Sequence, residues 1–568
     1  MNKDIVELQE DVSSSPLYSE DLAPVSKENR TWNKWNLAAI WVGMAVCIPT
    51  YLLASYMIKT GLSWIEALLI IGIANLIITV PMVLNGHAGV KYGVPFPVIG
   101  RSSFGTKGIH IPSVIRGIVA CGWFGVNTWL GGMAIYSIFI AISGNDAAVG
   151  LSFGQFVCFG IFWIMNMYFI WKGTESIKWL EEYSAPILII MGLILIGWGY
   201  SNAGGFGIVL EQGKQLEKPV AEIYHLQNEA NTNFIHINPI TDKEGNPKAT
   251  EYQLTLNGSE LGWNALSNSD ILIKKSGEND IYQIQLKNNT TTSSIADVVL
   301  RTNKSSFGYK IWKYLIWLTA MLGFWATMSL SIADITRYSS SQKAQVQGQF
   351  IGLPGTMMLY SFVGIFVTYA AIINFDDILI ANDAPWDPIA LLSKFDNVWV
   401  VVIAQLLMII ATLSTNIAAN VIAPANAFSN LLPKKISFRT GGFITGIIGI
   451  LIMPWLLLDE IQGLLIDVSA ILGPVLAILV CDYYLIKNKN IQIDELYKVN
   501  GVYAFNGSGF NKAAIISLII GAFIAIGGKW IPIMNSLYAV SWFSGFIISF
   551  GLYYFLMKRN SKLLTQKS

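Results

Sequence analysis

Residues 64–84 read WIEALLIIGIANLIITVPMVL, and this stretch decides the class of fold. Glu66 is its only charged residue, and the run is long enough to cross the hydrocarbon of a bilayer, which takes ~20 residues as a helix. Similar apolar runs occupy residues 39–58, 152–171 and 514–526. Across all 568 residues, 53% are hydrophobic and only 13% are charged, a composition that excludes an ordinary soluble domain. We therefore expect an all-α integral membrane protein.

The apolar runs, taken in order, predict about twelve transmembrane helices. An even number of spans returns the C-terminus to the side on which the chain began. The expected spans are residues 39–58, 64–84, 115–142, 152–171, 185–200, 311–335, 353–373, 399–430, 443–458, 461–486, 514–526 and 537–556.

Loop charge predicts the orientation of these spans in the plasma (inner) membrane. Loops rich in Lys and Arg stay in the cytoplasm, and alternate loops hold most of the basic residues, for example Lys91, Arg101 and Arg439. The opposite loops hold acids such as Asp376 and Asp377. Both termini are therefore expected in the cytoplasm. The polar first 31 residues lack the features of a signal peptide and are expected to form a cytoplasmic tail.

One hydrophilic segment, residues 207–306, interrupts the membrane portion between the fifth and sixth spans. Because five spans precede it and the chain is expected to start in the cytoplasm, this segment is expected to face outward. Strand-like runs at 252–256, 271–273 and 281–286 alternate with turn signals at Asn257-Gly and Ser276-Gly, which predicts a small β-rich extracytoplasmic insertion. A flexible polar loop is the alternative. The expected parts are a tail (1–31), spans one to five (32–206), the insertion (207–306), spans six to ten (307–486), and spans eleven and twelve with the C-terminus (487–568).

Charge and cysteine usage narrow the function. The 37 basic and 36 acidic residues nearly cancel, so no basic field is available for nucleic acid and we expect none to bind. The four cysteines all lie in apolar runs, without disulfide or zinc-site spacing: Cys47, Cys121, Cys158 and Cys481. An enzyme is not favoured, because no intramembrane His–carboxylate or metal cluster is apparent. A transporter and a membrane sensor with an outward ligand-binding segment remain as hypotheses.

Helix breakers inside spans indicate where a transporter binds its substrate and ion, since an unwound backbone exposes carbonyls and amides at mid-membrane. Pro49 falls within the first span and removes one backbone hydrogen bond. In the sixth span, residues 323–331 combine a glycine, a tryptophan and hydroxyls at similar depth. Breaks in spans one and six would fit two halves of opposite orientation. The alternative for Pro49 is a simple kink in a packing helix.

Polar residues in the eighth span suggest a binding role. Ser414, Thr415 and Asn416 can offer oxygen ligands to a small hard cation, and Asn420 lies about one turn further along the same face. In the third span Trp123 and Asn127 are four residues apart, so a flat ring and a carboxamide share one helix face. With Trp325, this combination suits a planar heterocycle. Interhelical hydrogen bonding and aromatic packing are the alternatives.

Several stretches together resemble the nucleobase–cation symporter family, whose members carry cytosine, uracil, allantoin, hydantoins and related compounds. They follow the family order along almost the whole membrane portion. These stretches are Asp21-Leu-Ala-Pro, Arg30-Thr-Trp, Cys47-Ile-Pro-Thr-Tyr, Asn85-Gly-His-Ala-Gly, Tyr92-Gly-Val-Pro-Phe-Pro-Val, Arg101-Ser-Ser-Phe-Gly, Cys121-Gly-Trp-Phe-Gly, Ser414-Thr-Asn-Ile-Ala-Ala-Asn, Leu472-Gly-Pro and Cys481-Asp-Tyr-Tyr. The hydrophilic insertion departs from the family pattern.

The resemblance implies two inverted five-helix repeats followed by two C-terminal helices. It implies a sodium site made from backbone oxygens of Gly43, Val46 and Ala411 and the hydroxyls of Ser414 and Thr415. The substrate would lie between Trp123 and Trp325, with Asn127 and Asn420 bonding its edges and Cys47 close by. Asn127 stands where a longer Gln or Glu is usual, and Cys47 stands where a hydantoin carrier has Gln.

We therefore predict secondary active import of a small planar compound in symport with a cation. Uracil or another pyrimidine is the first choice of substrate, and allantoin or a hydantoin the second. Na⁺ is the expected coupling ion, with no other cofactor, and a bend at Leu465 in the tenth span is expected to close over the site. A monomer in the lipid bilayer is expected. Proton-coupled or uncoupled transport of the same compounds, and a sensor derived from such a transporter, are the alternatives.

Overall fold

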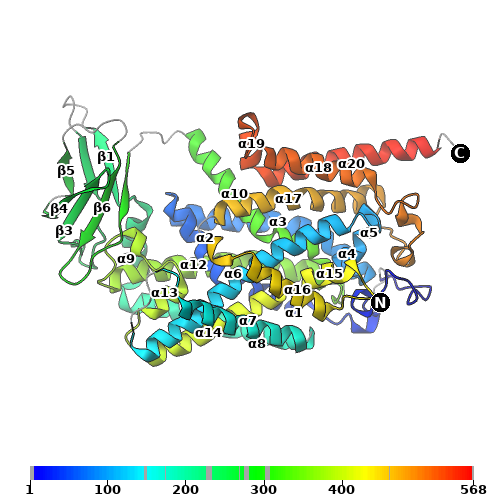
Figure 1. Cartoon of the computed structure of the whole chain (residues 1–568), viewed down its shortest axis with the longest axis horizontal. Coiled ribbons are helices and arrows are strands. Elements are labelled where there is room, and N and C mark those ends of the chain that lie inside the picture. Colours follow the sequence, from blue (N-terminus) through cyan, green and yellow to red (C-terminus); the bar gives the residue numbers. More distant parts are fainter. Residues whose placement is uncertain are drawn as a thin grey trace.

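A long bundle of helices with a β-sheet at one end makes up the molecule (Figure 1). The computed structural model describes residues 5–145, 150–172, 174–225, 233–267, 269–273, 280–300, 307–458 and 461–565. The helices of the bundle are α1 (Lys34–Ala45), α2 (Ile48–Lys59), α3 (Trp64–Tyr92), α6 (His110–Ser143), α7 (Phe153–Lys172), α8 (Thr174–Asn202), α10 (Phe307–Ser331), α12 (Gln342–Asn374), α14 (Val398–Asn420), α15 (Ile422–Leu431), α16 (Phe438–Leu451), α17 (Ile461–Cys481), α18 (Lys512–Gly527) and α20 (Ser541–Thr565).

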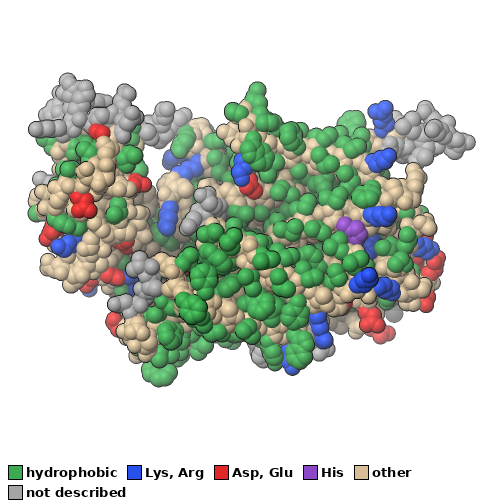
Figure 2. All heavy atoms as spheres, viewed as in Figure 1, with side chains coloured by type: hydrophobic (Ala, Val, Ile, Leu, Met, Phe, Trp, Pro, Cys, Tyr) green, Lys and Arg blue, Asp and Glu red, His purple; other side chains and the backbone are tan. Residues whose placement is uncertain are grey.

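Each of the twelve expected spans overlaps one or two of these helices. Within the described residues, seven helices are long and apolar enough to cross a membrane, and up to ten if each of three bent helix pairs is one span. Helix α16, which overlaps the expected span 443–458, is apolar but shorter. Helix α20, which overlaps the expected span 537–556, is not among the ten. On the face shown in Figure 2, hydrophobic side chains cover most of the middle, while most of the charged side chains lie toward the two ends. The multi-pass membrane class is confirmed.

The predicted break in the first span is confirmed. Helix α1 ends at Ala45, α2 begins at Ile48, and the two are bent by 58°. Val46, with φ −81° and ψ 79°, has left the helical region, and Pro49 lies in the first turn of α2, where a missing N–H costs nothing. The bend leaves Val46 and Cys47, both buried in the interior of the bundle, outside regular helix.

The predicted break in the sixth span is wrong. Residues 323–331 are helical throughout α10, and a break comes only at Ile332, before the short α11 (Ala333–Thr336). The hydroxyls of Ser329 and Ser331 donate to the carbonyls of Ala326 (2.7 Å) and Thr327 (3.0 Å) of the same helix, so they are satisfied without unwinding it. Gly323 serves close packing instead, because a Cβ there would lie 2.1 Å from the carbonyl oxygen of Leu465.

The hydrophilic insertion contains the predicted β structure. Seven strands form one sheet in the order β4-β3-β6-β7-β1-β2-β5. Asn257 and Gly258, both with positive φ, form the predicted turn between β3 and β4, whereas Ser276 lies outside the described residues. The strands are β1 (Ala221–His225), β2 (Asn233–Ile237), β3 (Glu251–Leu256), β4 (Ser259–Ala265), β5 (Asp270–Ile273), β6 (Tyr282–Lys287) and β7 (Ala296–Leu300). Residue 207, the expected start of the insertion, falls within a short helix, α9 (Gly205–Gln212).

The sheet packs against the segment that follows α12. Leu379 and Ile380 of that segment are part of the hydrophobic core of the sheet. Lys248 Nζ donates to the carbonyls of Ile372 (2.6 Å) and Phe375 (2.8 Å) at the C-terminal end of α12. Burial lowers the pKa of Lys248, while nearby carboxylates, Asp376 foremost, oppose this shift. The insertion is therefore attached to the bundle by a shared core as well as by its two chain connections.

The N-terminal tail forms an ordered strap, residues 5–32, at the end of the bundle opposite the sheet (Figure 1). The Asp21 carboxylate accepts from the backbone N–H of Phe438 (2.8 Å), and its carbonyl accepts from Arg337 (3.2 Å). The hydroxyl of Tyr497 donates to Leu22 (2.7 Å). The strap thus joins the segment after α11, the start of α16 and the segment after α17, which are distant in sequence. The helix α20 also ends on this side, so the chain begins and ends opposite the sheet (Figure 1).

Candidate functional site

A small cavity lies where the α1–α2 break meets α6, α10 and α14. Its volume is about 30 Å³, room for roughly two water molecules. The side chains around it come from residues more than 370 positions apart in the sequence. They are Met44, Cys47, Pro49, Trp123, Asn127, Phe324, Trp325, Thr327, Met328, Thr415, Ala419 and Asn420. All five residues predicted to bind the substrate are in this set.

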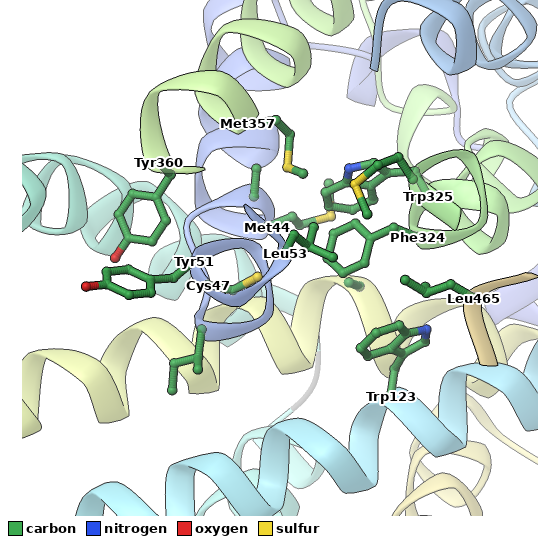
Figure 3. Close-up of a cluster of buried hydrophobic side chains, with 14 of the residues drawn as sticks. Met44, Cys47, Tyr51, Leu53, Trp123, Phe324, Trp325, Met357, Tyr360 and Leu465 are labelled. Carbon is green, nitrogen blue, oxygen red and sulfur yellow. The ribbon is translucent and has the colours of Figure 1, made fainter. Parts of the chain in front are cut away.

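Three aromatic rings form one side of the cavity (Figure 3). Phe324 contacts Trp123 edge-on, with ring centroids 5.4 Å apart at 83°, and contacts Trp325 edge-on at 5.0 Å and 80°. Trp325 also contacts Trp41 at 5.3 Å and 83°. The two predicted tryptophans therefore do not face each other across open space, because Phe324 stands between them. Sequence analysis did not single out Phe324, although it precedes Trp325 directly in the stretch that drew attention to the sixth span.

Asn127, Trp325 and Asn420 are among the polar side chains that line the cavity, together with Thr327 and Thr415. The Asn127 amide donates to the carbonyl of Trp123 (3.2 Å), and its Oδ1 is buried without a partner among the residues that the structure describes. The indole N–H of Trp325 is also buried without a partner. The Asn420 amide donates to Oδ1 of Asn416 (3.2 Å). A buried polar atom without a partner costs free energy, which a ligand with complementary groups would recover.

Cys47 is the N-cap residue of α2 and faces the same cavity. Its Sγ lies 3.3 Å from the hydroxyl of Thr50 in the next turn. A thiol is a weak hydrogen-bond partner, so Cys47 contributes shape more than polarity at this position.

The residues predicted to hold the cation lie between the α1–α2 break and α14, beside the cavity. The hydroxyl of Thr415 donates to the carbonyl of Gly43 (3.0 Å), which joins the two elements. The hydroxyl of Ser414 lies 2.8 Å from that of Ser184 on α8, a residue that sequence analysis missed. Val46 lies at the break and Ala411 one turn before Thr415, and both are buried. The Thr415 hydroxyl and the Gly43 carbonyl thus bring two neutral oxygens within 3.0 Å of each other.

Asn416 is not one of these candidate cation ligands, which corrects the expectation that it could offer an oxygen to a cation. Its amide nitrogen points to α6 and α7, where it donates to Thr128 Oγ1 (3.1 Å), Asn166 Oδ1 (3.1 Å) and the carbonyl of Phe124 (3.3 Å).

Leu465 is fully buried near the start of α17. It belongs to the apolar cluster that contains Phe324 and Trp123 (Figure 3), although it does not line the cavity. Its carbonyl oxygen packs against Gly323 of α10. The structure therefore places Leu465 beside the aromatic side of the cavity.

This architecture is shared with a membrane transporter of known structure. The chain superimposes on the nucleobase–cation symporter Mhp1 in a closed conformation with bromovinylhydantoin bound, with a TM-score of 0.65, 19% identity and 96% of each chain covered. A family model described as permease for cytosine/purines, uracil, thiamine, allantoin matches residues 24–226 and 284–545. The chain belongs to this permease family.

Two curated relatives align along nearly the whole chain. The allantoin permease of Bacillus subtilis is 31% identical, covering 96% of this chain and 94% of its own length. The purine-uracil permease NCS1 of Arabidopsis thaliana is 33% identical, covering 96% of this chain and 78% of its own length. Residues 227–283, which include strands β2 to β5, lie outside the family-model match.

Proposed function

We propose that this permease is a secondary active transporter that imports a small planar nucleobase-like compound together with Na⁺. The observation that carries the proposal is the cavity itself. Its three aromatic rings, two carboxamides and one unpartnered indole N–H lie beside the contact between Thr415 and Gly43. A flat ring with N–H and carbonyl groups at its edge complements both parts of this surface.

Uracil or another pyrimidine is our first choice of substrate, with allantoin or a hydantoin second. The relatives named above are permeases for allantoin and for purines and uracil, and the fold neighbour binds a hydantoin. These compounds share a compact ring or ureide with amide-like edges. The short Asn127 side chain fits a ligand that approaches α6 closely or bonds to it through water.

For the cation, the hydroxyls of Ser414 and Thr415 and the backbone oxygens of Gly43, Val46 and Ala411 form the proposed site. Ser184 adds a further hydroxyl from α8 next to Ser414. A cation here would hold α1, α8 and α14 together beside the cavity, so that cation and substrate favour the same arrangement of helices.

For the transport cycle, we propose twelve spans arranged as two inverted five-helix repeats plus two further helices, with both termini in the cytoplasm. One group of helices rocks against the other around the fixed site. Leu465 closes the site, because α17 contacts α10 directly at Gly323, next to the cavity-lining Phe324.

Uptake into vesicles tests the proposal. Labelled uracil, cytosine, allantoin and hydantoin are offered with and without an inward sodium gradient. The expected result is gradient-driven accumulation of at least one of them. Accumulation driven by a proton gradient alone would establish the alternative coupling, and no uptake of any compound would favour a sensor.

The double variant Ser414→Ala plus Thr415→Ala tests the cation site. It removes two hydroxyl ligands with little change in volume, so sodium stimulation should be abolished while the protein still folds. Thr412→Ala is the matched control, because Thr412 is an equally buried hydroxyl of α14 whose one bond within the described residues is to Met408 of its own helix. Wild-type sodium dependence in the double variant would place the cation elsewhere.

A further inference from the structure

Three asparagines from two helices, α7 and α14, form a continuous chain of hydrogen bonds that ends at the cavity. Asn166 on α7 donates to the carbonyl of Phe162 of its own helix (2.8 Å) and accepts from Asn416 (3.1 Å). Asn416 in turn accepts from the amide of Asn420 (3.2 Å). Asn166 and Asn416 are completely buried, and Asn420 is 6% exposed where it lines the cavity.

The orientation of each carboxamide in this chain follows from its surroundings. A backbone carbonyl only accepts hydrogen bonds, so the Asn166 group beside Phe162 O must be its NH₂, and its oxygen faces Asn416. The nitrogen of Asn416 then faces acceptors alone, because Thr128 already donates its hydroxyl hydrogen to the carbonyl of Phe124 (2.6 Å). Its oxygen therefore faces Asn420.

Asn420 is oriented in consequence. Its NH₂ must face Asn416 Oδ1, so its own Oδ1 is the atom left for a ligand. Asn127 is oriented in the same way by the carbonyl of Trp123, which takes its NH₂ and leaves Oδ1 buried without a partner. Both cavity carboxamides thus present acceptors, and the indole N–H of Trp325 is an unpartnered donor.

We propose that Asn166 and Asn416 are positioning residues for substrate selection: they hold the Asn420 oxygen toward the cavity, so that the site selects a ring edge with N–H donors. The inference rests on the proposed function and specifies its substrate class as cyclic imides and ureides whose ring N–H groups are free. If one of these three carboxamides turned over, the other two would have to turn as well, and their NH₂ groups would no longer face the oxygens that accept from them. The neighbouring acceptors therefore fix which atom of Asn420 faces the cavity.

N-methylated substrate analogues test, in the wild-type protein, whether the cavity selects ring N–H donors. Competition against uptake of labelled uracil or hydantoin, whichever is carried, is measured with the 1-methyl, 3-methyl and 1,3-dimethyl forms of the same ring. Leaving a cavity oxygen unpaired should raise the inhibition constant about 10- to 100-fold for the dimethyl form. Equal inhibition by the parent and dimethyl compounds would overturn the inference, whereas uptake of neither ring would count against the proposed function instead.

The variant Asn416→Leu tests whether Asn416 positions the carboxamide of Asn420. It removes the acceptor that holds the Asn420 NH₂, so Asn420 can turn and the ratio of the dimethyl to parent inhibition constants should fall about tenfold. Asn75→Leu is the control, since Asn75 is equally buried but, in the part of the chain that the structure describes, its side chain bonds only to Ile71 of its own helix. A merely structural role would lower transport of all compounds and leave this ratio unchanged, and that result would refute positioning by Asn416.

Discussion

Phe324 separates two spaces in the interior of the protein. The cavity described above and a second, smaller one that reaches Tyr56 and Leu458 are both lined by Phe324 and Trp123. The ring of Phe324 is 8% exposed and contacts a tryptophan on either side. A ligand that stacks on both tryptophans therefore requires Phe324 to turn away.

The variant Phe324→Ala should join the two cavities. We expect it to accept hydantoins or pyrimidines with bulky 5-substituents that the wild type excludes, and to raise KM for the unsubstituted ring several-fold, because edge contacts worth about 0.5–1.5 kcal/mol each are lost. Competition assays with a series of 5-alkyl analogues measure this. Phe324→Leu, which keeps most of the volume, is the control. An unchanged size limit in the alanine variant would show that Phe324 does not restrict the site.

At the level of single residues, the sequence identified conspicuous polar groups and missed ordinary ones. Asn127 and Asn420 stand out because a carboxamide among apolar neighbours is costly without a purpose. Phe324 does not stand out in the sequence, since phenylalanine is an apolar residue that also occurs on lipid-facing helix surfaces. The role of Asn166 depends on Asn416, 250 positions further along the chain, and no local pattern reveals that contact.

At the level of elements, α10 and α17 approach closely because residue 323 has no side chain. The expected Cβ would lie 2.1 Å from Leu465 O and 2.4 Å from Ser469 Oγ. Gly323→Val should therefore force the helices apart, cost about 1–3 kcal/mol or more, and abolish transport. Thermal unfolding in detergent measures the loss, with Gly551→Val of α20 as control, because space is open there. Equal stability of the two variants would contradict the packing role.

The contrast between α1–α2 and α10 shows what a sequence can predict about helix breaks. Pro49 removes a backbone donor wherever it occurs, so the break in the first span was predictable. Glycine and serine only permit a break, and in α10 the hydroxyls bond within the helix while Gly323 admits a neighbour. Tertiary packing decides between these outcomes, and it is not visible in a local pattern.

Lys248 links the sheet to the end of α12. Its ammonium group caps two carbonyls at the helix C-terminus, where a positive charge is also favoured by the helix dipole. Lys248→Met should cost about 1.5–3 kcal/mol and speed amide exchange in residues 375–387, as measured by mass spectrometry. The exposed Lys243→Met is the control. Unchanged exchange in both variants would mean that the shared core alone holds the sheet.

At the level of the whole molecule, the sheet and the N-terminal strap lie at opposite ends of the bundle (Figure 1). The loop charges predict that the sheet is outside the cell. All four native cysteines are buried, so a new cysteine in place of the exposed Ser259 of β4 should react with an impermeant maleimide in intact cells. Ser508→Cys, exposed at the other end, should react only after lysis. The reverse pattern would invert the topology.

The sequence alone predicted the class, the order of the helices and the strands of the insertion, because bilayer thickness and strand alternation leave periodic traces. It predicted a plain tail for residues 1–31. The strap was not predictable, since its polar residues resemble those of any solvated terminus until their distant partners are known.

The partners of the strap have a consequence for the order in which the protein is assembled. Gln9 bonds to Asp494, 485 positions later, and Tyr497 bonds to Leu22 at a separation of 475. The strap also bonds to Lys91 and Gly93, which are made early, so only part of its docking surface awaits the late segment. Seating of the strap is thus complete only in a molecule in which residues 494–497 are already in place.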